Sequence, residues 1–384
     1  MKIITLGPSY PYRGGLASFS DRLAKQFSDE GHSIEIFTFS LQYPKLLFPG
    51  KTQYTESPVP HALEISRSVN SINPFTWLST GRKLKQKRPD ILLIRYWLPF
   101  MAPALGTIAR ITRRNKHTKV ISIFDNVIPH ENRPGDRLLT KYFMGSIDGA
   151  VVMSHTVAND LKIFRQDIPV VFNPHPLFDN YGEKVTRAEA LKSLQLNTEH
   201  RYLLFFGFIR AYKGLDLLIE AFSDERLRNM NLKLVIAGEF YEDDAPYRQL
   251  IKKKKLENDV IIFDRFIRDE EVPLFFSISD LVVQPYKSAT QSGVTQIAFH
   301  YDKPMLVTDV GGLKEIVTDG KCGYVVKPYP KKIADAIVDF FEYKRYDSFA
   351  EGIRNEKERF SWDKMSSSIL DLYNRYLSSG NRNS

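Results

Sequence analysis

The chain has 384 residues, of which 43% are hydrophobic and 26% are charged. Since a domain typically holds about 150 residues, this length predicts two domains, each able to bury its own core. The composition is typical of a globular protein and excludes a disordered or fibrous chain. Cys322 is the only cysteine, which excludes an intrachain disulfide and a thiolate metal site and favours a reducing, cytoplasmic setting.

The formal net charge of +9 is unevenly distributed. Residues 1–180 hold 23 Lys and Arg against 14 Asp and Glu, whereas residues 181–384 hold 31 of each kind. The surplus is densest over residues 82–119, where Asp90 is the one acidic residue. Such a basic segment attracts a polyanionic surface, either nucleic acid or an anionic membrane leaflet.

Apolar residues accompany the basic segment, at Trp77–Leu78 and at Trp97–Met101. This mixture is typical of docking on a membrane surface. No helix-turn-helix, zinc-finger or aromatic-rich RNA-binding motif is present, so nucleic acid is not an expected partner. The uncharged run 96–109 is too short to span a bilayer. We therefore expect a cytoplasmic protein that docks peripherally on the inner face of the membrane through residues 82–119; a solvated basic face without a partner is the alternative.

Apolar runs of strand length alternate with helical patterns along the first half of the chain. The expected strands are Lys2–Leu6, Ser33–Phe39, Asp90–Tyr96, Lys119–Phe124, Gly149–Met153 and Val170–Phe172. Several consist almost entirely of Val, Ile, Leu and Phe, as strands do when both faces of a parallel sheet are buried. This half therefore predicts a doubly wound α/β domain.

The same pattern restarts after a proline-rich and polar junction that begins at Asn173 and is the expected hinge. The expected strands are then Tyr202–Phe206, Leu232–Ala237, Val260–Phe263, Leu281–Gln284 and Met305–Thr308. An amphipathic segment, Trp362–Leu377, closes the pattern. The predicted fold class is α/β, with two doubly wound Rossmann-like domains.

Two cations, Arg210 and Lys213, precede a predicted helix within the stretch GFIRAYKGLDLLIEAF of residues 207–222. The N-terminus of a helix already carries a partial positive charge, so further cations there are unfavourable unless an anion binds. Arginine as a fork and lysine as a point charge together suit a diphosphate. Two solvated loop cations are the alternative.

A glycine pair, Gly14-Gly15, follows the first expected strand and opens a predicted helix. Glycines let a ligand approach the backbone closely, although a plain tight turn explains the pair equally well. The pattern is not the G-x-G-x-x-G fingerprint, and no acidic residue follows the next strand at the ribose position. A dehydrogenase is therefore not expected.

Three motifs of the second half together resemble family 4 of the glycosyltransferases. They are G-x-x-R-x-x-K-G at Gly207–Gly214, a helix entered through Ser292-Gly293, and DVGGLKE at Asp309–Glu315. The PYRGGLA loop at residues 11–17 and the closing helix fit as well, so the resemblance covers essentially the whole chain.

The resemblance implies the GT-B fold, in which two Rossmann-like domains face a central cleft and the C-terminal helix crosses back to the N-domain. The implied boundaries are 1–178 with 360–384 for an acceptor-side domain, and 179–359 for a nucleotide-sugar-binding domain. It also implies retaining transfer of a hexose from a UDP- or GDP-sugar to a glycan or lipid-linked acceptor, in the synthesis of cell-surface polysaccharide or glycolipid.

The resemblance assigns the diphosphate of the donor to Arg210 and Lys213. The implied donor-binding residues are Gly14, Gly15, Gly207, Arg210, Lys213, Ser288, Thr290, Gln291, Ser292, Gly293 and Gln296. No metal or other cofactor is expected, since the sequence has no Asp-x-Asp pair and cationic side chains with helix dipoles can stabilise the leaving diphosphate instead.

The sequence departs from the family pattern at two positions that usually hold glutamates, eight residues apart. These positions correspond to Ser288 and Gln296. Glutamine can still accept one hydrogen bond from a ribose hydroxyl and donate another, but it brings no charge. A non-catalytic relative that binds a nucleotide sugar or carbohydrate is therefore the alternative function.

On the acceptor side, the family often has a histidine before an aspartate at the end of the fourth strand of the N-domain, where this chain has Phe124-Asp125. His130 follows a few residues later. Asp125 and His130 join Arg210 and Lys213 as candidate catalytic residues, with purely structural roles as the alternative. The family mechanism implies attack on the same face as the leaving group, assisted by positioning and charge stabilisation.

Overall fold

The structure is a computed structural model that describes residues 1–44, 52–55, 63–129, 133–290 and 292–377. The chain divides into two compact units. Unit 1 comprises Met1–Pro176 and Phe360–Ser384, and unit 2 comprises Leu177–Arg359. Each unit is a parallel sheet packed with helices, so the predicted doubly wound α/β class is confirmed.

Unit 1 is built on a parallel sheet, which in the described residues has the spatial order β3-β2-β1-β4-β5-β6-β7. Its strands are β1 (Lys2–Leu6), β2 (Ser33–Leu41), β3 (Ile65–Asn70), β4 (Ile91–Tyr96), β5 (Lys119–Phe124), β6 (Gly149–Val152) and β7 (Val170–Phe172). The order reverses between β1 and β4, which makes the loops after these strands the topological switch point of the unit.

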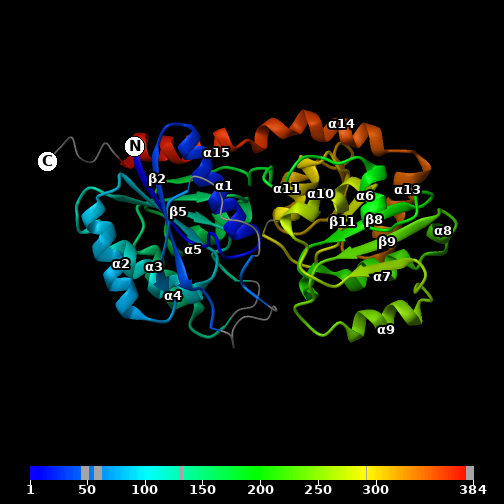
Figure 1. Cartoon of the computed structure of the whole chain (residues 1–384), viewed down its shortest axis with the longest axis horizontal. Coiled ribbons are helices and arrows are strands. Elements are labelled where there is room, and N and C mark those ends of the chain that lie inside the picture. The colour runs from blue at the N-terminus through cyan, green and yellow to red at the C-terminus, as the bar shows by residue number, and fades with distance from the viewer. Residues whose placement is uncertain (45–51, 56–62, 130–132, 291, 378–384) are drawn as a thin grey trace. The chain divides into compact units, whose positions relative to one another are not determined.

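The helices of unit 1 pack in two groups. They are α1 (Gly15–Asp29), α2 (Pro74–Lys87), α3 (Ala102–Arg113), α4 (Asp136–Met144), α5 (His155–Phe164) and α15 (Trp362–Leu372), with 3-10 turn η2 (Pro99–Met101) and π-turn η6 (Tyr373–Leu377). Helix α3 contacts α2, α4 and the central strands β4 and β5, whereas α1 packs with α15. Figure 1 shows the blue α1 beside the red α15.

The closing helix α15 is held on unit 1 by both apolar and polar contacts. Residues Phe19, Leu23 and Phe27 form a buried stripe on α1, and the ring centroids of Phe19 and Trp362 lie 5.0 Å apart, edge to face. Beside them, the Gln26 amide donates to the Asp363 carboxylate over 2.6 Å. The predicted return of the C-terminal helix to the N-domain is therefore confirmed.

Unit 2 is a second parallel sheet, which in the described residues has the order β10-β9-β8-β11-β12-β13. Its strands are β8 (Arg201–Phe206), β9 (Leu232–Ala237), β10 (Val260–Phe263), β11 (Leu281–Gln284), β12 (Met305–Thr308) and β13 (Gly323–Val326). The switch point lies between β8 and β11, because β8 is followed by β9 on one side of the sheet and β11 by β12 on the other.

The helices of unit 2 connect these strands. They are α6 (Arg187–Ser193), α7 (Leu215–Phe222), α8 (Glu225–Arg228), α9 (Ala245–Lys253), α10 (Val272–Ile278), α11 (Gly293–His300), α12 (Leu313–Ile316), α13 (Pro330–Glu342) and α14 (Tyr346–Glu356), with short 3-10 turns η3 (Ala211–Lys213), η4 (Asp269–Glu271) and η5 (Lys357–Phe360). The stripe predicted for α7 is buried in the core of the unit together with the inner face of α13.

The sequence analysis missed the edge strands β3 and β13. Strand β3 has the polar sequence ISRSVN, and only Val69 in it is buried. In β13, Gly323 is buried and the next three residues are half-buried. Edge strands are covered less than central ones, so they do not need the continuous apolar run on which the prediction depended.

The acid sensitivity of unit 1 gives a first prediction. His175 is buried, with its ring edge-on to Phe19 at a centroid distance of 5.1 Å. Burial and, to a smaller extent, the nearby Arg95 cation lower the pKa of His175 to about 3. A histidine in the unfolded chain titrates near 6.5, so below this pH the unfolded state binds a proton that the folded state excludes. The unfolding free energy should then fall by up to about 1.4 kcal/mol per pH unit as the pH drops from about 6 toward 3.

The measurement is urea unfolding of the wild type and His175→Gln at pH 6.5 and pH 4.5, followed by tryptophan fluorescence. The three tryptophans, Trp77, Trp97 and Trp362, all lie in unit 1, so the signal reports that unit. The variant should lose less stability on acidification than the wild type. His155→Gln, at an exposed position of the same unit, is the control; equal slopes in all three proteins would contradict the prediction.

Candidate active site

The candidate site of unit 2 lies at the carboxyl ends of its central strands. The loop after β8 contains Gly207, Arg210 and Lys213, and the loop after β11 contains residues 285–292. These two strands flank the switch point of the sheet, which is where open α/β sheets bind their ligands. The structure therefore brings the cationic pair and the polar loop of the sequence analysis to one edge.

The two cations stand directly before helix α7, as predicted. Arg210 precedes the 3-10 turn that ends at Lys213, and α7 begins at Leu215. The guanidinium carbon of Arg210 lies 5.5 Å from the centroid of the Tyr212 ring. The ammonium of Lys213 lies 5.7 Å from that of Tyr286. Each cation is thus half-buried against an aromatic face rather than extended into solvent.

The charges at this helix terminus repel one another. Burial lowers the pKa of the Lys213 ammonium, and the positive Arg210 lowers it further. Asp216, in the first turn of α7, is bound by Lys287 at 2.7 Å. An anion that reached Arg210 and Lys213 would offset their repulsion and use the exposed N–H groups of the helix.

Two glycines let the loops of the site approach closely. Gly214 has φ 68°, and a Cβ built on it would lie 2.0 Å from the carbonyl oxygen of Pro285. Gly311 has φ 49°, and its Cβ would lie 1.5 Å from the carbonyl oxygen of Ala289. Any side chain at either position would collide with the loop after β11. The loops after β8, β11 and β12 are therefore packed backbone against backbone.

Backbone hydrogen bonds join the same loops. The Lys287 N–H donates to the Tyr212 carbonyl over 2.7 Å, and the Gly312 N–H donates to the Thr290 carbonyl over 3.1 Å. The first bond connects the β11 loop to the turn that carries Lys213, and the second connects it to the start of α12. The cationic pair is thus fixed relative to the β11 loop.

The entrance to α11 is a buried polar network. Gln284, the last residue of β11, donates to the Ser292 hydroxyl over 2.7 Å and accepts from the Thr295 hydroxyl over 2.7 Å. Thr290 and Ser292 are buried, and Ser288 and Gly293 are half-buried. Gln291 lies outside the described residues. Ser292 therefore helps to shape the loop, while Ser288 lies nearer its surface.

Gln296, on the first turns of α11, is fully buried. Among the described residues, neither its amide nitrogen nor its amide oxygen has a hydrogen-bond partner. An unsatisfied buried polar group costs about 1–3 kcal/mol. The residue that replaces the second family glutamate is thus an uncompensated donor and acceptor beside the loop that the sequence analysis selected.

The described candidate residues of unit 1 lie after two different strands, with Gly14 and Gly15 after β1, at the switch point, and Asp125 directly after β5. Gly14 is the N-cap of α1, with φ 96°, and Gly15 is the first residue of that helix. Asp125 directly follows β5, and the Arg95 guanidinium binds its carboxylate in a buried bidentate ion pair. Both carboxylate oxygens face one cation, which favours a structural role for Asp125 over proton transfer. His130 lies outside the described residues.

The basic segment 82–119 does not lie wholly on the surface. Arg95 is buried under its ion pair, because it lies on the central strand β4, so its expected place in the docking surface is wrong. Lys87 pairs with Glu35 at 2.8 Å. The apolar flank also divides, since Trp97 and Met101 belong to the core, whereas Leu78 on α2 is exposed.

The sequence analysis missed an aromatic cluster at the same edge of unit 2. The ring centroid of Phe208 lies 4.5 Å from that of Tyr241 and 5.9 Å from that of Phe266. These residues follow β8, β9 and β10, and all three are half-buried. A signal was present, because an aromatic residue stands two to four positions after the end of each strand. These aromatic residues can be recognised as a cluster only when the strand order is known, because that order shows that β8, β9 and β10 are neighbours in the sheet.

The described residues contain no group of three or more His, Cys, Asp or Glu side chains that could hold a metal ion. No helix in the described part of the chain is long and apolar enough to cross a membrane.

Comparison with known proteins identifies the two halves of the chain separately. Residues 13–177 match the model of Glycosyltransferase Family 4, and residues 186–356 match that of Glycosyl transferases group 1. The chain belongs to the family 4 glycosyltransferases. It is therefore a retaining glycosyltransferase that takes its sugar from a nucleotide sugar, as the resemblance implied.

Relatives with this architecture extend over the full chain. An uncharacterized glycosyltransferase of Methanocaldococcus jannaschii is 22% identical over 97% of this chain and 98% of its own length. The O-antigen chain mannosyltransferase C of Escherichia coli is 23% identical over 95% of each chain.

Solved structures show the fold of this glycosyltransferase. Sucrose-phosphate synthase from Thermosynechococcus elongatus superposes with a TM-score of 0.75 at 15% identity, over 99% of this chain and 100% of that one. The Anabaena protein HepE, in complex with UDP and glucose, superposes with a TM-score of 0.72 at 16% identity, over 98% and 100% of the two chains. The fold is therefore GT-B, as predicted.

The packing of the site loops gives a second prediction. Gly214→Ala should destabilise unit 2 by about 1–2 kcal/mol for the left-handed backbone and by about 1–3 kcal/mol more for the clash with Pro285. It should also raise the KM for the nucleotide-sugar donor, because Arg210 and Lys213, which precede Gly214 in the same loop, would move. Gly320→Ala is the matched control, with a similar φ of 71° but nothing within 4 Å of the added Cβ. Thermal unfolding and steady-state kinetics test this, and equal losses in the two variants would contradict it.

Proposed function

We propose that unit 2 binds a UDP- or GDP-sugar with its diphosphate at Arg210 and Lys213. The observation that carries the proposal is the placement of this pair directly before α7 at the switch point of the sheet. A diphosphate brings the negative charge that the pair and the helix terminus need. The family membership supports the same ligand class.

The rest of the nucleotide has candidate contacts on the same edge. Gln296 is a buried amide without a partner, and a ribose diol can accept from its nitrogen and donate to its oxygen. The half-buried rings of Phe208, Tyr241 and Phe266 offer apolar faces on which a nucleobase can stack. Ser288 and the Gly293 N–H supply neutral hydrogen bonds for the sugar in place of a carboxylate.

The proposed chemistry is same-face transfer without a covalent intermediate on the protein. Retention by double displacement needs a carboxylate beside the anomeric carbon, and Ser288 stands where the family usually has one. The departing phosphate oxygen therefore takes the proton of the acceptor hydroxyl, while Arg210 and Lys213 stabilise the charge on the leaving diphosphate. We propose that unit 1 receives the acceptor and that Gly14 and Gly15, which let a ligand approach the backbone closely, take part in donor binding.

The acceptor class is proposed from the relatives and from the charge of unit 1. A cell-surface glycan or a lipid-linked precursor fits the named activity of the Escherichia coli relative, which is an O-antigen chain mannosyltransferase. The base and the sugar of the donor then decide which polysaccharide or glycolipid is made.

Donor turnover tests the proposal. Arg210→Ala and Lys213→Ala should each lower kcat/KM for hydrolysis or transfer from a UDP- or GDP-sugar by about 10²-fold, since each removes a group that stabilises leaving-group charge. The nucleotide diphosphate should also cease to raise the melting temperature of the variants. Arg354→Ala, an exposed arginine on α14, is the control. A non-catalytic binding relative would show the thermal shift but no turnover with any donor.

We also propose that unit 1 docks on an anionic membrane through one face of α2. Phe75, Leu78, Arg82 and Lys85 recur at spacings of three and four residues, and all four are exposed. Phe75 leaves 82% of its surface in solvent. A helix face with apolar residues at one end and basic residues at the other suits the interface between acyl chains and anionic headgroups.

Vesicle sedimentation tests this docking face. The wild type should sediment with vesicles of anionic phospholipid at low salt and be released at high salt. The double variants Phe75→Ser/Leu78→Ser and Arg82→Gln/Lys85→Gln should each bind at least about tenfold more weakly, since each basic residue near such a surface contributes about 1 kcal/mol. Tyr343→Ser, which changes an exposed aromatic residue of unit 2, should bind as the wild type does. Absence of binding at every ionic strength would rule the docking face out.

A further inference from the structure

A pocket of unit 2 lies at the amino ends of its strands, at the edge opposite the candidate active site. Its volume is about 520 Å³, within the range of small-molecule sites. Asp280 stands directly before β11 and Lys303 shortly before β12. The pocket is lined by these residues together with Lys184, Arg187, Ser277 and Tyr346. The full length of β11 and β12 separates it from Gln284, at the end of β11, and from Asp309, which follows β12.

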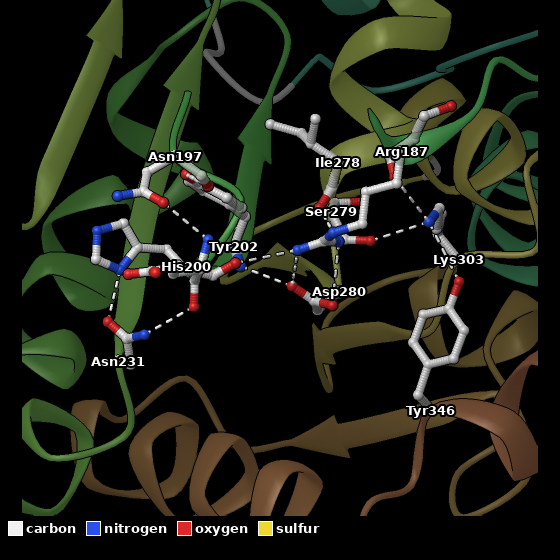
Figure 2. A network of polar contacts seen from close by, with 12 residues as sticks. Arg187, Asn197, His200, Tyr202, Asn231, Ile278, Ser279, Asp280, Lys303 and Tyr346 are labelled. Atoms are coloured by element: carbon white, nitrogen blue, oxygen red, sulfur yellow. Dashed lines mark hydrogen bonds and ion pairs between the residues drawn. The ribbon is translucent and has the colours of Figure 1, made fainter. Parts of the chain in front are cut away.

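Lys303 is the central cation of this pocket, and only 4% of its surface is exposed. Its ammonium donates to the Ser279 carbonyl over 3.0 Å and to the Tyr346 hydroxyl over 3.2 Å (Figure 2). It donates a third, longer hydrogen bond to the Ser277 carbonyl over 3.4 Å. All these acceptors are uncharged. Burial and, to a smaller extent, the nearby Lys184 cation lower the pKa of Lys303 to about 8.

The carboxylate that lines the pocket is already paired. Arg187 binds Asp280 in a bidentate contact, with N–O distances of 3.0 and 3.2 Å (Figure 2). The Tyr202 N–H donates to the same carboxylate over 2.7 Å. Because Asp280 and Arg187 neutralise one another, the pocket keeps the positive charge of Lys303 and Lys184.

The pocket also contains hydroxyl groups that can donate hydrogen bonds to a ligand. Ser277, on α10, is 3% exposed, and among the described residues its hydroxyl has no partner. The Tyr346 hydroxyl accepts from Lys303, so its own proton is free to point elsewhere. A buried hydroxyl without a partner costs free energy unless a ligand or water satisfies it. Donors from α10, α14 and the turn before β12 thus meet around one cavity.

We propose that this pocket is a binding site for a small metabolite that carries a phosphate group. The terminal oxygens of a phosphate can accept from Ser277 and Tyr346, and from Lys303 in place of its long bond to the Ser277 carbonyl. Lys303 and Lys184, at the rim, balance the negative charge of the phosphate. The volume exceeds that of inorganic phosphate, so the remaining space admits the body of a phosphorylated metabolite. The site is distinct from the proposed donor site, and its existence does not depend on the identity of the donor.

Calorimetric titration of the full chain with inorganic phosphate and with glucose 6-phosphate tests the proposal. Phosphate can also bind to Arg210 and Lys213, which form the proposed diphosphate clamp. The titrations are therefore made in the wild type and in Arg210→Ala. Binding should persist in Arg210→Ala. Lys303→Met should then weaken it at least tenfold, and Ser277→Ala and Lys184→Gln should each weaken it several-fold. Lys332→Met, an exposed lysine of α13, should change nothing.

The outcomes separate the two sites. Affinity that is lost in Arg210→Ala but kept in Lys303→Met and Lys184→Gln would assign phosphate to the clamp and overturn the proposal. If Lys303→Met does not fold, Lys184→Gln and Tyr346→Phe, which alter an exposed and a half-buried side chain, decide alone. Tighter binding of glucose 6-phosphate than of inorganic phosphate supports a metabolite site, and equal affinity overturns that part. Loss of turnover in the clamp variants would leave this result unaffected.

Discussion

The close approach of backbone to backbone at Gly214 and Gly311 is the constraint on which the site of this glycosyltransferase depends. Both glycines face carbonyl oxygens of the loop after β11, at distances that no side chain allows. The loops that follow β8 and β12 are thereby fixed against this central loop. The charges of Arg210 and Lys213 repel one another. The two residues nevertheless stay close together before α7, because the loop that carries them is held against the loop after β11.

Several groups of unit 2 cost stability in the folded chain. Lys213 is a half-buried cation whose pKa is lowered by desolvation, and Gln296 is a buried amide without a partner among the described residues. A continuous apolar core under α7 and α13 offsets these costs. A bound ligand would compensate the charge of Lys213 and the unsatisfied amide of Gln296. Preorganising these groups for binding therefore lowers the stability of the ligand-free fold.

Much of the fold and part of the site could be read from the sequence. Central strands such as β4 and β11 are buried on both faces and therefore appear as apolar runs, and the stripe of α7 locates its start behind Lys213. The edge strands β3 and β13 lack that signal because solvent covers part of them. The ion pair of Arg95 with Asp125 joins residues 30 positions apart. The pocket at the amino ends of the unit 2 strands is lined by residues as far apart in the sequence as Lys184 and Tyr346. Local sequence patterns do not predict such long-range contacts, so the sequence analysis wrongly placed Arg95 on the surface.

The route of the chain through α15 bears on the order in which the units form during synthesis. Unit 2 is continuous, from Leu177 to Arg359, so a ribosome releases all of it before α15 appears. Unit 1 begins earlier but lacks the helix that packs on α1 until Trp362 and the residues after it emerge. The half of the protein that is translated first is therefore the half that is completed last, and the part of α1 that Trp362 covers in the folded chain stays uncovered in that interval.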